Sequence, residues 1–156
     1  MIRNYKESDK RGLEKCIVEL QEFERKLQPD FRTKGSVIAV AYRKYLVKKI
    51  KNMHGKIFVA EVNKKISGFA AILLENQTSP CMKIKKNAYI IDLVVLSKDR
   101  KSGVGSALLK RAEKFALDAG VSNIFLDVMF NNKLALSFYN NHGFENRGIT
   151  LLKKLI

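Results

Sequence analysis

Two glycines one residue apart follow a pair of cations in the run Arg100-Lys101-Ser102-Gly103-Val104-Gly105. Glycine has no side chain to keep a ligand away from the backbone, and the first turn of a helix leaves about four N–H groups without partners. Such amides, at the positive end of the helix dipole, bind phosphate groups. The run therefore predicts a site for a pyrophosphate, with Arg100 and Lys101 adding positive charge at its edge.

The segments on either side of this run have the patterns that such a site needs. Residues 88–96 are rich in β-branched and aromatic residues and predict a strand that is buried on both faces. Apolar residues at helical spacing then continue to Ala119, and Gly120 predicts a left-handed helix end. The helix is expected to begin near residues 103–105. A Rossmann fingerprint would need a third glycine at Leu108, and a P-loop would need a Gly-Lys-Ser/Thr ending, so neither nucleotide motif is present.

A second motif lies within residues 126–144, which predict a strand at 126–130, an asparagine-capped loop, a helix that ends at Gly143 and the start of another strand. Ala135 and Tyr139 share one face of this helix, because residues three and four positions apart are neighbours. The order strand, Arg-x-x-Gly-x-Gly, helix, strand, Asn-x-x-Ala-x-x-Phe-Tyr and Gly-Phe resembles the GNAT superfamily of acetyl-CoA-dependent N-acetyltransferases.

Length and composition predict one domain that spans residues 1–156, since a chain of this size with 46% hydrophobic residues is able to form its own core. No stretch approaches the roughly 20 consecutive apolar residues of a membrane span, and the N-terminus is too polar for a signal peptide. We expect a soluble, cytoplasmic protein. Cys16 and Cys81 lie in unrelated segments without metal-ligand spacing, so free thiols and no metal site are expected.

The whole chain predicts an α/β (α+β) protein with a βααβββαβαββ order of elements. Outside the two motifs, the predicted elements are a strand at 2–5, helices at 8–27 and 36–52, a strand hairpin at 56–62 and 66–75, and final antiparallel strands at 143–147 and 149–155. The resemblance implies the single-domain GNAT fold, a mixed central sheet flanked by helices. In that fold the strands around Leu93 and Leu126 run parallel and splay apart.

The resemblance also implies that acetyl-CoA is the cosubstrate, with its pantetheine arm in the splay. Leu93 and Val95 would pair with that arm through their backbone, and an N–H near Val94 or Val95 would polarise the thioester carbonyl. Asn132 would hydrogen-bond the arm, and Tyr139 would protonate or hydrogen-bond the departing thiolate, because a phenol of pKa about 10 stays protonated in apolar surroundings. The complete implied cofactor set is Leu93, Val94, Val95, Arg100, Lys101, Ser102, Gly103, Val104, Gly105, Ser106, Asn132, Ala135 and Tyr139.

The base that accepts the proton of the amine is left open by the resemblance. Many members carry a glutamate just before the aspartate of the central strand, and the matching position here is Ile91. Asp127 is the first choice, because members that acetylate protein N-termini carry a glutamate at that position. Asp92 is the alternative, with structural hydrogen bonds as its other role. His142, at the end of its helix, is interpreted as a surface residue.

Charge supplies a hypothesis about the acceptor. The net charge is +15, and residues 31–60 contain no acidic residue. The resemblance places this segment beside the acceptor site, which favours an acidic acceptor such as an aminoacylated RNA, an acidic protein N-terminus, or a small amine that bears phosphate or carboxylate. The alternative is a solvated lysine-rich face, and Glu22, Glu24 and Asp30 could form an acidic wall instead.

Three further hypotheses stay open. The chain could be a non-catalytic nucleic-acid-binding protein on a GNAT framework, which the basic segment and Ile91 would explain. It could also bind acetyl-CoA as a sensor without transferring the acetyl group. A homodimer through the last strands is the third option, with Leu151, Leu152 and Leu155 as its interface if they are exposed.

Overall fold

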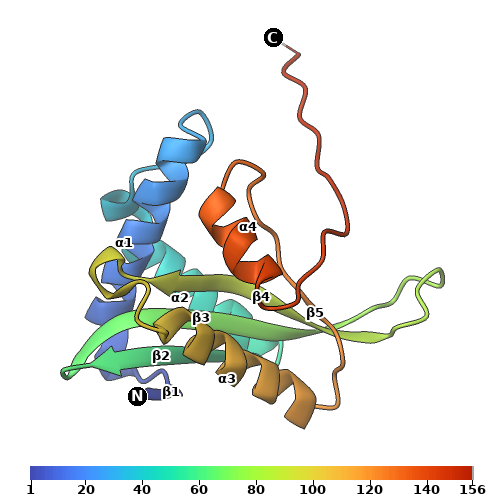
Figure 1. Cartoon of the computed structure of the whole chain (residues 1–156), viewed down its shortest axis with the longest axis horizontal. Helices are drawn as coiled ribbons and strands as arrows, with labels where there is room; N and C mark the ends of the chain where they lie inside the picture. The colour runs from blue at the N-terminus through green and yellow to red at the C-terminus, as the bar shows by residue number, and fades with distance from the viewer. Residues whose placement is uncertain (156) are drawn as a thin grey trace.

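The structure is a computed structural model that describes residues 1–155 (Figure 1). Its centre is a five-stranded sheet in the order β1-β2-β3-β4-β5, in which β1 to β4 are antiparallel neighbours and β5 runs parallel to β4. The strands are β1 (Ile2–Asn4), β2 (Lys56–Val62), β3 (Lys65–Asn76), β4 (Lys86–Val95) and β5 (Ile124–Phe125). The mixed sheet flanked by helices confirms the predicted fold class.

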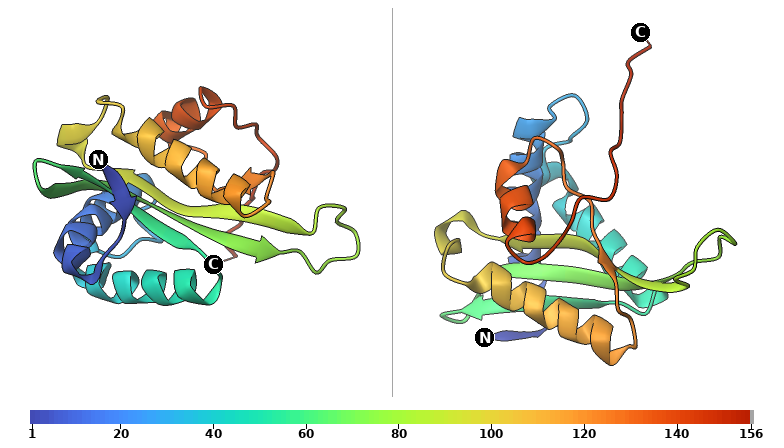
Figure 2. Two further views of the ribbon diagram at one scale, coloured as in Figure 1. Left: turned by 90° about the horizontal axis from the view of Figure 1, so that it is seen from below. Right: turned by 45° about the vertical axis from the view of Figure 1, so that its right-hand side comes forward.

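Helices cover both faces of this sheet (Figure 2). The helices are α1 (Lys10–Leu27), α2 (Gly35–Asn52), α3 (Val104–Asp118) and α4 (Lys133–Asn140), and short 3₁₀ turns lie at Glu7–Asp9 and Ser97–Asp99. On one face, α1 and α2 bury a stripe that includes Leu13, Ile17 and Leu46. On the other face, α3 packs Leu108 and Ala112 against the sheet, and α4 adds its side chains there. Helical spacing of apolar residues thus gives each helix one buried side.

A β-bulge interrupts β4 at Ile91. Asp92 pairs with Ala71 and Ile90 pairs with Ile72, so Ile91 has no partner in β3. The extra residue changes the alternation of side chains along the strand. As a result, the neighbours Ile91 and Asp92 both face α1 and α2, although an unbroken strand would place them on opposite faces.

The strand predicted around Leu126 is present as β5, but it is shorter and lies at Ile124–Phe125. The predicted final strands at 143–147 and 149–155 are wrong. The strand β5 ends at Phe125, and residues 143–155 form no strand. A strand needs a hydrogen-bonding neighbour, and β5 offers an edge of only two residues. The last segment extends away from the sheet (Figure 1), and its apolar side chains are exposed, as at Leu151 (89%) and Leu155 (83%).

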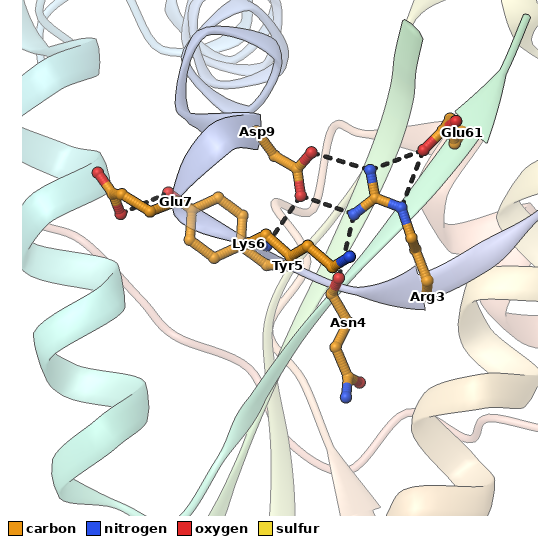
Figure 3. A network of polar contacts seen from close by, with 7 residues as sticks. All are labelled: Arg3, Asn4, Tyr5, Lys6, Glu7, Asp9 and Glu61. Atoms are coloured by element: carbon orange, nitrogen blue, oxygen red, sulfur yellow. Dashed lines mark hydrogen bonds and ion pairs between the residues drawn. The ribbon is translucent and has the colours of Figure 1, made fainter. Parts of the chain in front are cut away.

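An ion-pair network joins β1, the first 3₁₀ turn and β2 (Figure 3). The Arg3 guanidinium donates to both carboxylate oxygens of Asp9 at 2.7 and 2.9 Å, and its Nε and Nη2 donate to Glu61 Oε2 at 2.9 and 2.6 Å. The backbone N–H of Lys6 also donates to Asp9 at 2.8 Å. The hydrogen bonds from Arg3 hold the pKa of Asp9 below its usual range. The network therefore fastens the N-terminal strand to the turn that starts α1.

We expect Arg3→Met to lower the free energy of unfolding by about 2 kcal/mol at pH 7, because it leaves the carboxylates of Asp9 and Glu61 without their cation. Since the pKa of Asp9 is lowered in the folded state, this contribution is present above the pKa of an unfolded aspartate. It is lost as the pH falls through the lower folded value. Urea unfolding at pH 7 and pH 3 measures the effect.

The matched control is Lys114→Met, which removes an exposed ion pair to Asp118 and should change stability by under about 0.5 kcal/mol. An equal loss at both pH values would contradict the assignment to Asp9.

Candidate active site

The predicted phosphate site is a left-handed turn that leads into α3. Gly103 is the N-cap residue with φ of 83°, and an added Cβ there would meet nothing within 4 Å. The N–H of Ala107 donates to the Gly103 carbonyl at 3.0 Å, so the N–H groups of Val104, Gly105 and Ser106 belong to the open first turn. The turn therefore presents amides to open space, as an anion site requires.

Arg100 lies differently from the expectation. Its Nε donates to the Val95 carbonyl at 3.0 Å, and its Nη2 lies 3.4 Å from Glu19 of α1. Its guanidinium is also 5.8 Å from the ring centre of Phe23. The Arg100 side chain thus connects the end of β4 to α1. The other cation of the run is Lys101, whose backbone is left-handed with a φ of 58°.

The edge of β4 that faces β5 is open over most of its length. Only Ala88 and Tyr89 pair with β5, after which the strands separate. The N–H of Leu96 donates to Ser67 in β3 at 2.8 Å, and backbone groups of successive residues in a strand point in opposite directions. The backbone groups of Leu93 and Val95 therefore point into the gap, and those of Val94 point toward β3. This confirms the predicted splay of the parallel pair.

The α4 helix carries the second motif beside the gap. The Asn132 side chain accepts a hydrogen bond from the Ala135 N–H at 3.1 Å, which starts the helix and leaves the side-chain NH₂ unused by the cap. Tyr139 is partly buried, with the rings of Phe138 and Phe144 at 5.2 and 5.4 Å. Burial raises the pKa of Tyr139 to about 12. Its hydroxyl is therefore protonated at neutral pH and able to donate a proton or a hydrogen bond.

Asp92 accepts a hydrogen bond from the Tyr42 hydroxyl at 2.8 Å. The bulge at Ile91 turns the carboxylate toward α2, where Tyr42 projects from the middle of the helix. Burial raises the pKa of Asp92 to about 6, although the hydrogen bond from Tyr42 opposes the shift. A carboxylate with this pKa is able to accept a proton near neutral pH.

Asp127 lies just beyond β5 and is exposed. The Tyr89 hydroxyl donates to its carboxylate at 2.7 Å, across the start of the gap. Asp92 and Asp127 therefore each have a tyrosine partner, one from α2 and one from β4. The two tyrosine partners were not predicted, because nothing in the sequence links Tyr42 to a residue 50 positions later.

Both aspartates line one cavity of about 200 Å³ between α1 and β4, here called the Asp92 cavity. Gln21 and Glu24 of α1 and Arg32 of the following loop also line it. The cavity thus brings together the two carboxylates that the sequence proposed as bases. The sequence predicted Glu24 only as part of an acidic wall. Its position near the end of the first helix was the one indication that it would line this cavity.

His142 is exposed, as predicted, and links the two motifs. Its Nε2 lies 2.9 Å from the Ser106 hydroxyl in the first turn of α3, and its Nδ1 lies 2.7 Å from the Phe138 carbonyl. Gly105 is also close to α4, since an added Cβ would lie 3.4 Å from the Phe138 ring. The end of α4 therefore packs on the start of the phosphate site.

Residues 1–155 contain neither a cluster of metal ligands nor a helix suited to span a membrane. No group of three or more histidine, cysteine, aspartate or glutamate side chains could hold a metal ion there. No helix in this part of the chain has the length and apolar character to cross a membrane.

Known sequences match over most of the chain. The sequence model of the Acetyltransferase (GNAT) family matches residues 18–144. An N-alpha-acetyltransferase of Sulfurisphaera tokodaii is 25% identical over 105 residues, which cover 65% of this chain and 63% of that protein. N-acetyltransferase 8F1 of Rattus norvegicus is 27% identical over 115 residues, which cover 71% of this chain and 50% of that protein. The chain thus spans about half to two thirds of these relatives.

Solved structures share the fold at lower identity. A mutant protein from Bacillus halodurans has a TM-score of 0.83 and 22% identity, with 100% of this chain and 99% of that chain covered. The glucosamine-6-phosphate N-acetyltransferase of Arabidopsis thaliana has a TM-score of 0.71 and 23% identity, with 100% and 98% covered. Similarity at this identity concerns the fold, which agrees with the sheet and helices described above.

Proposed function

Because the chain belongs to the acetyltransferase (GNAT) family, we propose that it transfers the acetyl group of acetyl-CoA to a primary amine, by direct attack of the amine within a ternary complex. The observation that carries the proposal is the open edge of β4. This edge joins the phosphate site at the start of α3 to the Asp92 cavity. The amine nitrogen bonds to the thioester carbonyl carbon, and the carbon–sulfur bond breaks with its electron pair on sulfur.

The residues of the phosphate site fit the cofactor. The open amides of Val104, Gly105 and Ser106 would hold the pyrophosphate, and Lys101 would screen its charge. The NH₂ of Asn132 and the backbone of Leu93 and Val95 would orient the pantetheine arm, with Ala135 packed beside it. Val94 is buried in the core under α1 and α2 and its backbone points toward β3, so of the two predicted N–H groups only that of Val95 is available to polarise the thioester carbonyl. Arg100 must leave the Val95 carbonyl before that carbonyl can accept from the arm. When bound, acetyl-CoA supplies the activated acetyl group.

Asp92 is our choice as the base that takes the proton of the amine. Its pKa of about 6 keeps it ionised at neutral pH, yet close enough to the working range to accept a proton efficiently. Tyr42 holds the carboxylate in place at 2.8 Å. Asp127, the first choice from sequence, is exposed and faces the same cavity. It stays the alternative, and the pH profiles of Asp92→Asn and Asp127→Asn distinguish the two.

Tyr139 is proposed to protonate the departing thiolate. We expect Tyr139→Phe to lower kcat about 100-fold, since a positioned acid contributes roughly that factor or more. The Kd for acetyl-CoA should change less than about twofold, because only the hydroxyl is lost and the ring still packs on Phe138 and Phe144. Calorimetry with acetyl-CoA measures binding, and thiol release over a panel of amines measures transfer.

The matched control for this experiment is Tyr45→Phe, which removes an exposed hydroxyl from α2 and should leave both quantities unchanged. Equal losses of binding and transfer in Tyr139→Phe would contradict the role of the hydroxyl. If the parent protein fails to bind acetyl-CoA more tightly than adenosine diphosphate, the transferase proposal itself is wrong. Salt-sensitive binding of nucleic acid would then favour the non-catalytic alternative.

The acceptor is a primary amine in this proposal, and a protein N-terminus is among the candidates. The name of the Sulfurisphaera relative, N-alpha-acetyltransferase, supports that class. The expectation of an acidic acceptor depends on the basic residues of α2 and its flanks. The charges that line the Asp92 cavity decide whether such an acceptor would be attracted or repelled there.

A further inference from the structure

The Asp92 cavity has more negative than positive groups. Three carboxylates line it, from Glu24, Asp92 and Asp127, and Arg32 is the one cation among its lining residues. The Arg32 guanidinium lies 3.2 Å from Glu24, so its charge is already paired. Three negative charges against one positive charge leave an excess of two when all groups are ionised. An anionic ligand would be repelled by this lining, and a cation would be attracted.

The basic segment does not reverse this charge. Arg43 is buried and turned toward the first turns of the chain, where it pairs with Glu14 at 2.7 Å. Most lysines of the segment are exposed to solvent, namely Lys34, Lys44, Lys48, Lys51 and Lys56. Lys49 is half-buried and does not line the cavity, but its charge, like that of Arg32, lowers the pKa of Asp92. A net charge of +15 therefore coexists with a locally acidic cavity. The exposed lysines lie outside the lining of the cavity.

Glu24 is the residue through which α1 acts on the cavity. Its carboxylate is partly buried, and burial raises its pKa although Arg32 opposes the shift. Repulsion from Glu24 also contributes to the raised pKa of Asp92. The two carboxylates therefore repel each other inside one cavity. A bound ammonium group would relieve this repulsion, because it interacts favourably with both.

Two exposed aromatic side chains lie in the segments that supply lining residues of the cavity. Phe31 (57% exposed) precedes Arg32, and Phe130 (79% exposed) lies three residues after Asp127, with the Lys133 ammonium 4.4 Å from its ring centre. The loop that bears Phe130 is joined to the end of α1 by a hydrogen bond of 3.1 Å from the Asn131 side chain to the Leu27 carbonyl. Exposed aromatic side chains at a polar cavity are suited to contact the side chains of a bound peptide.

We infer that the acceptor is the N-terminal amine of a peptide whose leading residues are neutral or basic, with Glu24 as the residue that selects for this charge. In a peptide the carboxyl group beside the amine is an amide, so the ammonium enters the cavity without an accompanying anion. A free amino acid, a phosphorylated amino sugar or an aminoacylated RNA brings an anion to the same carboxylates. This inference depends on the proposed function for the identity of the site, and its charge preference is measurable without turnover.

The test uses three peptides that differ only at positions two and three, which are both alanine, both lysine or both aspartate. Calorimetry in the presence of coenzyme A measures their binding, and thiol release with acetyl-CoA measures transfer. We expect the aspartate peptide to bind and react about tenfold less well than the other two. In Glu24→Gln this discrimination should shrink to about twofold, mainly through KM, because the variant loses one negative charge and leaves Arg32 unpaired.

The matched control is Glu113→Gln on α3, on the opposite face of the sheet, and it should keep the tenfold discrimination. Equal or better use of the aspartate peptide by the parent protein would overturn the inference and leave the transferase proposal intact. Binding with the expected preference but without transfer would support the inference and contradict the transferase proposal. If none of the peptides binds but a phosphorylated amine does, the inference is wrong.

Discussion

Gly103→Arg is expected to weaken acetyl-CoA binding at least about 100-fold, because each phosphate contact in a helix first turn depends on close approach to the backbone. The new side chain would project from the N-cap of α3, where an added Cβ meets no protein atom within 4 Å. The fold should therefore survive. The left-handed φ of 83° makes arginine about 1 kcal/mol less favourable than glycine at this position.

Gly120→Arg is the matched control for this result. Gly120 has φ of 71°, and an added Cβ there also meets nothing within 4 Å, but it lies beyond the opposite end of α3. The two variants should lose similar stability in thermal unfolding, and only Gly103→Arg should lose acetyl-CoA binding in calorimetry. Retained binding in Gly103→Arg would show that the cofactor does not use the first turn of α3.

Asp92→Asn should lower kcat about 100-fold or more, because asparagine keeps the shape of the side chain but is unable to accept the proton of the amine. The pH dependence of kcat tests the role of Asp92 more specifically than the size of the loss. With a pKa of about 6, Asp92 becomes ionised as the pH rises through 6, so the parent rate should increase over that range and then level off. The variant should lose this rise, which a pH series of kcat from 5 to 8 measures.

Asp127→Asn is the control for the base assignment. Both variants replace a carboxylate that accepts a hydrogen bond from a tyrosine, Tyr42 or Tyr89, in the same cavity. We expect Asp127→Asn to keep the rise near pH 6. A flat profile in Asp127→Asn, with an unchanged profile in Asp92→Asn, would return the role of base to Asp127, as the sequence first suggested. Acetyl-CoA binding should be similar in both variants.

The parts of the site that depend on local sequence were predictable. Left-handed φ values at Gly103 and Gly120 and the capping of α4 by Asn132 follow from residue type and position alone. The splay of β4 from β5 followed from the family resemblance, and the pairing at Ala88 and Tyr89 confirms it. Local signals were sufficient for the glycine turns and the helix cap, because these features involve neighbours in the chain, whereas the splay joins distant strands and needed the resemblance.

The parts that depend on distant contacts were not predictable. The bulge at Ile91 has no residue signature, yet it decides that Asp92 faces the cavity and not the opposite face of the sheet. A sequence likewise does not show that Arg43 of the basic segment is buried against Glu14. The acidic acceptor that this segment suggested stays a prediction. The final strands failed for a similar reason, since apolar residues at 149–155 form a strand only where a neighbouring strand is present.

The hydrogen bond from Arg100 to the Val95 carbonyl has a consequence for ligand design. Pairing of the pantetheine arm at Val95 would replace this bond with another of similar strength, and such an exchange contributes close to zero free energy. Most of the affinity should then come from the diphosphate end, where the amides of α3 have no protein partner to displace. Inhibitors should therefore be anchored at the phosphate site, and extending them along β4 would add selectivity together with the remaining affinity of the cofactor.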